Sequence, residues 1–135
     1  MAVVDASVMV ARSRRQDAHY IAASRFLNPL IQGVGFDAPT ILATEVASGV
    51  SQAGADPSSA IRVQRWLMRH DRIRLHPVTR ELASRAAEIA AWHGIRGCDA
   101  VYVALAETLG TELVTFDGQQ RERGATVVPT RTPRA

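Results

Sequence analysis

Short apolar segments alternate with longer amphipathic segments along almost the whole chain. The short segments are predicted to be strands, at residues 2–4, 34–38, 72–76, 111–117 and 125–128. The segments between them carry apolar residues at helical spacing and are predicted to be helices, at residues 17–32, 39–54, 56–68, 79–92 and 98–106. Strands separated by helices in this way form parallel crossovers. We therefore expect an α/β fold, an α/β/α sandwich around a central, mainly parallel sheet of about five strands.

The length of 135 residues corresponds to one domain. We expect a single domain over residues 1–128 and a short C-terminal tail over residues 129–135, which contains no core-forming residues. Ser7 is predicted to be the N-cap of a short helix after the first strand.

All sixteen basic residues are arginines, because the sequence contains no lysine. This excludes P-loop nucleotide hydrolases, Schiff-base enzymes and phospho-aspartyl enzymes, all of which use a lysine amine. The formal net charge of +3 describes a modestly basic protein, and guanidinium groups suit phosphate partners.

Cys98 is the single cysteine, so no internal disulfide is possible, and we expect it to be a small buried residue. The chain has no apolar run long enough for a membrane span, and its first residues show no export signal. These features predict a cytoplasmic protein.

Acidic residues stand where two of the predicted strands end. Asp5 follows the first strand and Asp117 closes the fourth. The carboxyl ends of parallel strands meet at one edge of the sheet, where ligands bind in folds of this class. Asp99 lies in the first turn of a predicted helix, and Glu45 lies about one turn into another. Each acid alone is typical of a turn or a helix start, but together they indicate one acidic cleft.

Four segments of the chain, taken in order, resemble the signature regions of PIN-domain ribonucleases, and most closely those of VapC-type toxins from bacterial toxin–antitoxin pairs. The segments are Val3-Val4-Asp5-Ala6-Ser7, Thr44-Glu45-Val46, Cys98-Asp99-Ala100-Val101-Tyr102-Val103-Ala104-Leu105-Ala106 and Leu113-Val114-Thr115-Phe116-Asp117. The resemblance extends from residue 2 to about residue 128.

The resemblance implies a catalytic quartet of acids that holds Mg²⁺ or Mn²⁺, with two hydroxyl neighbours. The quartet is Asp5, Glu45, Asp99 and Asp117, and the neighbours are Ser7 and Thr115. A hard divalent ion would compensate four converging carboxylates, whereas zinc prefers histidine or cysteine. We expect Asp5 and Asp99 to be direct ligands, Asp117 a ligand at a second site, and Glu45 either a ligand or the residue that positions the attacking water. The family implies products with a 5′-phosphate and a 3′-hydroxyl.

The partners that the resemblance implies are an RNA substrate, a cognate antitoxin and a second copy of the chain. The candidates for RNA binding are Arg12, Arg14, Arg15 and Arg96. The apolar faces of the helices at residues 17–32 and 57–69 are expected to dock the antitoxin or the second copy.

Two other functions remain open at this point. One is a catalytically silent PIN-like domain that binds RNA or protein with the same arginines and apolar helices. The other is a metal-dependent DNA nuclease on the same fold. An intact quartet argues against the silent domain, and a comparison of RNA and DNA cleavage separates the two nucleases.

Overall fold

The computed structural model describes residues 1–134, in which five strands and seven helices form one α/β unit. The elements are β1 (Ala2–Val4), α1 (Ala6–Arg12), α2 (Tyr20–Gln32), β2 (Phe36–Pro39), α3 (Leu42–Gln52), α4 (Pro57–Arg69), β3 (Ile73–His76), α5 (Arg80–His93), α6 (Gly97–Leu109), β4 (Glu112–Val114), α7 (Gly118–Gly124) and β5 (Thr130–Arg131). None of the helices in residues 1–134 is long and apolar enough to cross a membrane.

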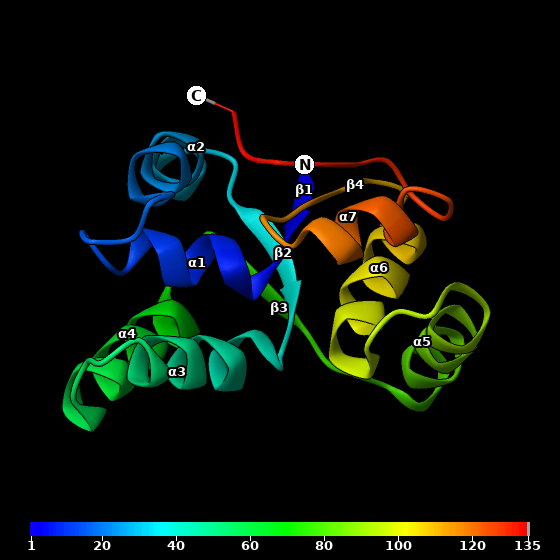
Figure 1. The fold of residues 1–135 in the computed structure, drawn as a ribbon, viewed down its shortest axis with the longest axis horizontal. Coiled ribbons are helices and arrows are strands. Elements are labelled where there is room, and N and C mark those ends of the chain that lie inside the picture. The colour runs from blue at the N-terminus through cyan, green and yellow to red at the C-terminus, as the bar shows by residue number, and fades with distance from the viewer. Residues whose placement is uncertain (135) are drawn as a thin grey trace.

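The sheet is parallel throughout, and its strand order is β3-β2-β1-β4-β5. In Figure 1, α1 to α4 lie on one side of the sheet and α5 to α7 on the other. This arrangement confirms the predicted α/β/α fold with a parallel five-stranded sheet. The chain runs from β1 to β2 and β3 on one side and later returns to β4 and β5 on the other, so the strand order reverses between β1 and β4. A crevice forms at such a reversal, at the carboxyl ends of the two strands.

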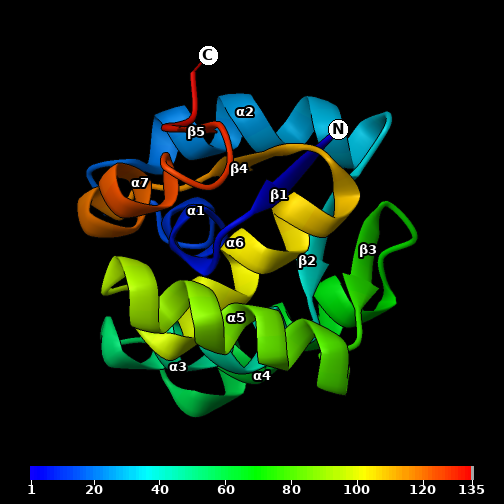
Figure 2. The same ribbon diagram turned by 90° about the vertical axis from the view of Figure 1, so that its right-hand side faces the viewer.

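The core lies between the central strands and α6. Val3 and Val4 of β1 and Leu113 and Val114 of β4 are fully buried. α6 crosses the face of these strands (Figure 2), and residues 102–104 on it are fully buried as well. A helix that is apolar nearly all round is stable only inside a fold, because little of its surface is suited to water. Its burial fixes the position of its N-terminal turn, which carries Asp99.

The prediction of a last strand at residues 125–128 is wrong. The amides of Val127 and Val128 both donate to the carbonyl of Gly124, at 2.9 and 3.0 Å, so they form a turn after α7 and are not available to a sheet. The chain pairs with β4 only after this turn, where the Leu113 amide donates to the Pro129 carbonyl at 2.9 Å. The fifth strand is therefore Thr130–Arg131, within the segment expected to be a tail.

Two predictions for single residues are also wrong. The N-cap of α1 is Asp5 and not Ser7, because the Asp5 carboxylate accepts the Ser7 amide at 3.0 Å. A carboxylate two residues before a free amide satisfies that donor better than a hydroxyl inside the first turn. Cys98 is exposed rather than buried, because it lies at the solvent-facing start of α6.

Candidate active site

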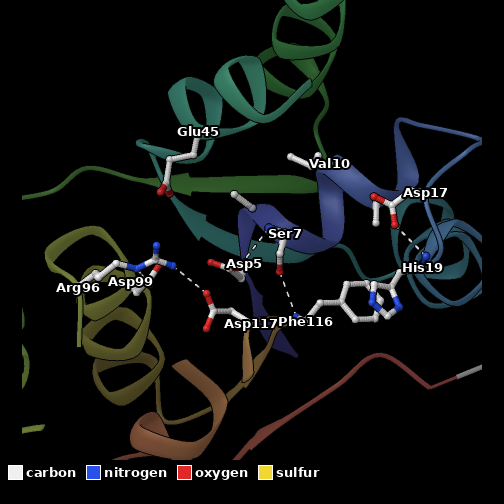
Figure 3. Close-up of a pocket in the computed structure, with 12 residues that line it drawn as sticks. Asp5, Ser7, Val10, Asp17, His19, Glu45, Arg96, Asp99, Phe116 and Asp117 are labelled. Atoms are coloured by element: carbon white, nitrogen blue, oxygen red, sulfur yellow. Dashed lines mark hydrogen bonds and ion pairs between the residues drawn. The ribbon is translucent and has the colours of Figure 1, made fainter. Parts of the chain in front are cut away.

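The four predicted acids line one cleft at the carboxyl edge of β1 and β4 (Figure 3). The cleft has a volume of about 380 Å³, within the range of small-ligand sites. Asp5 directly follows β1, and Asp117 follows β4 as the N-cap of α7. Asp99 comes from the first turn of α6, and Glu45 comes from the first turn of α3. Four segments that are distant in sequence therefore supply one carboxylate each to the same cavity.

Asp5 is the most deeply held of these acids, and only 5% of its surface is exposed. Its Oδ2 accepts the Ser7 amide at 3.0 Å and the Thr115 hydroxyl at 3.1 Å. Its Oδ1 faces the Gln120 amide group, which donates at 3.4 Å. A buried carboxylate that accepts several hydrogen bonds keeps a fixed orientation.

Ser7 and Thr115 tie the start of α1 to the end of β4. Their hydroxyl oxygens are 3.3 Å apart. The Ser7 Oγ also accepts the Phe116 amide at 3.1 Å, and the Thr115 Oγ1 accepts the Asp117 amide at 3.0 Å. The two hydroxyls thus hold the backbone that carries Asp117, close to Asp5.

Arg96 lies across the mouth of the cleft and pairs with two of the acids. Its Nε donates to Asp99 Oδ2 at 3.0 Å, and its Nη2 donates to Asp117 Oδ2 at 2.8 Å (Figure 3). The charges of Asp99 and Asp117 raise the pKa of Arg96. The pKa of Asp99 is nevertheless raised, because burial and the nearby charge of Asp5 outweigh the attraction of Arg96.

Glu45 is half-buried, and its Oε1 has no hydrogen-bond partner among the described residues. Burial is the main cause that raises the pKa of Glu45; the Tyr102 hydroxyl and Arg96 act in the opposite direction, whereas the charges of Asp5 and Asp99 add to the rise. The Tyr102 hydroxyl lies near Glu45, yet it too has no partner with hydrogen-bonding geometry in residues 1–134. The cleft therefore holds more negative charge than Arg96 balances.

The donor chemistry of this cleft suits a hard divalent cation, because all four acids offer oxygen ligands and one buried oxygen is unpartnered. Among residues 1–134, however, no three acidic, histidine or cysteine side chains lie close enough together to hold a metal ion. Two of the carboxylates are instead paired with Arg96. The four acids would have to draw together to share an ion.

Of the four arginines predicted to bind RNA, only Arg96 lines the acidic cleft. Arg12 donates to the Asn28 side chain at 2.9 Å and lies over the ring of Trp66, and burial lowers the pKa of Arg12. Arg14 donates to the Ala53 carbonyl at 2.8 Å, and Arg15 lines a second cavity together with it. These three side chains therefore lie outside the carboxylate site.

Gln120, Asp17 and His19 belong to the site but were not predicted. Gln120 is buried, and besides Asp5 it binds the carbonyl of Asp99 at 3.2 Å. A sequence signal for Gln120 exists, because Asp117 and Gln120 have the spacing of a capping box. The Asp117 carboxylate accepts a hydrogen bond from the backbone amide of Gln120 at 2.9 Å. Asp17 and His19 line the other end of the cleft, and no sequence pattern marks them.

The fold and the cleft together define an α/β protein with a carboxylate site at the strand-order reversal of a parallel sheet. The model of the PIN domain family matches residues 2–125, and the chain belongs to this family. No curated protein sequence matches the chain.

Three solved structures show the same fold at low sequence identity. The toxin VapC20 of Mycobacterium tuberculosis, described as cleaving the sarcin–ricin loop, has a TM-score of 0.79 and 20% identity, over 92% of this chain and 95% of its own. VapBC2 of Rickettsia felis, bound to a promoter DNA fragment, gives 0.69 and 14%, over 97% of each chain. FitAcB of Neisseria gonorrhoeae gives 0.68 and 21%, over 98% of each chain.

Proposed function

We propose that this protein is a metal-dependent endoribonuclease and the toxin of a toxin–antitoxin pair. The observation that carries the proposal is the convergence of four acids from four elements on one cleft, with Asp5 buried and a Glu45 oxygen unpartnered. Membership of the PIN domain family and the structural likeness to VapC20 support it.

Asp5, Asp99, Asp117 and Glu45 are the residues that would hold Mg²⁺ or Mn²⁺. Such an ion, when bound, makes a water molecule more acidic and offsets charge at the reacting phosphate. Ser7, Thr115 and Gln120 keep Asp5 oriented through the hydrogen bonds described above. Outer groups of this kind contribute about 10- to 100-fold to metal affinity or activity.

Arg96 is the residue best placed to bind a substrate phosphate. It carries a fixed positive charge at the mouth of the cleft, and 70% of its side chain is exposed. Planar guanidinium groups bind phosphate oxygens through two parallel hydrogen bonds. In this arrangement the RNA backbone enters over Arg96 and brings its phosphorus towards the acids.

The antitoxin and a second copy of the chain are proposed to bind the exposed apolar side chains of α2 and α4. These are Ile21, Ile61, Trp66 and Met68, which are 64, 42, 38 and 53% exposed. The two helices lie on the same side of the sheet (Figure 1), and exposed apolar surface of this kind marks candidate interaction sites. Size-exclusion chromatography with light scattering tests the homodimer directly.

The test of the enzymatic function compares the wild type with Asp5→Asn and Asp99→Asn. Both variants keep the size of the side chain but remove its charge. We therefore expect the rate of RNA cleavage in Mg²⁺ or Mn²⁺ to fall by more than about 100-fold, which exceeds the loss typical of residues that only orient the metal ligands. Asp71→Asn is the matched control, because Asp71 is exposed and outside the cleft. Circular dichroism checks that each variant is folded.

Cleavage that survives EDTA or both substitutions would contradict the proposal. Equal or faster degradation of single-stranded DNA would indicate a DNA nuclease on this fold. Tight RNA binding without metal uptake in calorimetry would indicate a silent binding domain.

A further inference from the structure

Two aromatic rings stack at the end of the cleft opposite Arg96. The imidazole of His19 and the ring of Phe116 have centroids 4.2 Å apart and planes inclined by only 13°. Figure 3 shows the two rings on one side of Ser7 and the carboxylates of Asp99 and Asp117 on the other. The cavity therefore has a carboxylate end and an aromatic end.

Hydrogen bonds hold the backbone of both residues. The His19 amide donates to Asp17 Oδ1 at 2.8 Å, and the carbonyl of His19 accepts the amide of Ala23 in α2. The Phe116 amide donates to Ser7 Oγ at 3.1 Å, within the network that orients Asp5. The ring pair thus has a set position relative to the acids.

The His19 ring is available to a ligand. His19 stands at the N-cap position of α2, yet its side chain makes no capping bond, and within residues 1–134 its hydrogen bond to a side chain is made by the backbone amide and none by the ring nitrogens. The side chain is exposed, whereas Phe116 is half-buried and packs against the core. One face of the imidazole therefore covers Phe116 and the other is open to solvent.

We propose that the ring pair of His19 and Phe116 is a stacking site for an unpaired nucleobase of the RNA substrate, next to the phosphate that is cleaved at the carboxylate end of the cavity. The inference rests on the proposed endoribonuclease function and adds the form of RNA that the cleft accepts. Proteins bind unpaired bases by stacking them on aromatic side chains, and a base inside a duplex offers no free face. The site favours loops and single strands over duplexes and tolerates different bases, since every base has a flat face.

The test uses the full-length protein and a short single-stranded RNA that carries 2-aminopurine, a base whose fluorescence falls when it stacks. Binding is measured by fluorescence with Ca²⁺ in place of Mg²⁺, and KM and kcat are measured separately in Mg²⁺. The variants are His19→Ala, which removes the outer ring, and His19→Phe, which keeps a ring without its nitrogens. Trp92→Ala is the matched control, because Trp92 is 84% exposed and lies outside the cleft.

We expect His19→Ala to weaken RNA binding and raise KM roughly 5- to 100-fold, in line with the loss of one stacked base, with a smaller effect on kcat. The quenching of 2-aminopurine should be lost in His19→Ala, restored in His19→Phe and unchanged in Trp92→Ala. Binding of a blunt duplex should not respond to His19→Ala.

A wild type that cleaves RNA in Mg²⁺, with His19→Ala equal to it in KM and quenching, would overturn the stacking site and leave the proposed function intact. Failure of His19→Phe to restore either quantity would assign His19 to proton transfer or hydrogen bonding and also overturn it. If the wild type neither binds nor cleaves RNA, the proposed function and the stacking site both fail.

Discussion

At the scale of single residues, the charge of Arg96 determines whether Asp99 and Asp117 are free to bind a cation. Its guanidinium contacts Asp99 and Asp117 at 3.0 and 2.8 Å and so occupies two carboxylates that are candidates for metal binding. Exposed ion pairs are worth only about 0.2–1 kcal/mol each, so Arg96 can be displaced at modest cost. Its fixed position three residues before Asp99 keeps it near the acids after displacement.

Replacing Arg96 by Gln should therefore strengthen divalent metal binding. The substitution removes a competitor for two carboxylates and a positive charge that repels the cation, so we expect about 2- to 10-fold tighter binding of Mn²⁺ by isothermal titration calorimetry. Arg65→Gln is the control for net charge, because Arg65 is exposed on α4, away from the cleft. Equal or weaker Mn²⁺ binding in Arg96→Gln would show that Arg96 does not compete with the ion.

At the scale of elements, the sequence predicted α4 and α5 better than the C-terminal part of the chain, where α7 was not predicted and the last strand was misplaced. Asp56 and Thr79 cap α4 and α5 through their side chains, and Gly94 ends α5 in the left-handed conformation, close to the predicted helix bounds of 56–68 and 79–92. Local hydrogen bonds determine such ends, so a short stretch of sequence is enough to indicate them. β5 was misplaced because its register depends on pairing with β4, and no local pattern within residues 125–131 specifies that partner.

An ion pair links β2 to the edge strand β3. Asp37 is 2% exposed and accepts hydrogen bonds from Arg74 at 3.0 and 3.1 Å and from His76 at 2.8 Å. Asp37→Ala leaves two partners without their acceptor, so we expect about 1–3 kcal/mol lower free energy of unfolding in urea at pH 7. Glu88→Ala, which removes an exposed partner of Arg85, should cost less than about 0.5 kcal/mol. Equal losses in the two variants would contradict this ranking.

The ion pair of Asp37 makes the stability of the fold depend on pH. Burial alone would raise the pKa of Asp37, but the hydrogen bonds and charges of Arg74 and His76 outweigh it, and the pKa is lowered. The contribution of Asp37 is therefore complete above its unfolded pKa of about 3.9 and is lost as the pH falls through its folded pKa. The stability gap between wild type and Asp37→Ala should narrow below about pH 4. A constant gap would show that the charge of Asp37 does not matter.

At the scale of the whole molecule, we expect a cation bound by the four acids to stabilise the fold. Four segments meet at the cleft, so an ion held there would link β1, α3, α6 and the start of α7. Mg²⁺ or Mn²⁺ at about 100 times its Kd should add ~2.7 kcal/mol. Each kcal/mol of added stability corresponds to a rise in Tm of about 2–8 °C.

Thermal unfolding in Mn²⁺ and in EDTA measures this effect. The difference in Tm should be large for the wild type and Asp71→Asn and small for Asp5→Asn. The same difference in Asp5→Asn would place the ion elsewhere.

The sequence by itself determined the parallel α/β architecture and the placement of four acids along it, because hydrophobic periodicity and chain direction are local properties and parallel strands share one carboxyl edge. Only the tertiary structure decided which side chains beyond the predicted ones reach the cleft, and what each side chain contacts there. Arg96 pairs with Asp99 and Asp117, His19 stacks on Phe116, and Arg12 packs against Trp66 instead. Apart from the pair of Arg96 with Asp99, these contacts join segments that are far apart in sequence. Their geometry depends on how the helices pack against the sheet and on the course of the loops, which no local pattern in the chain encodes.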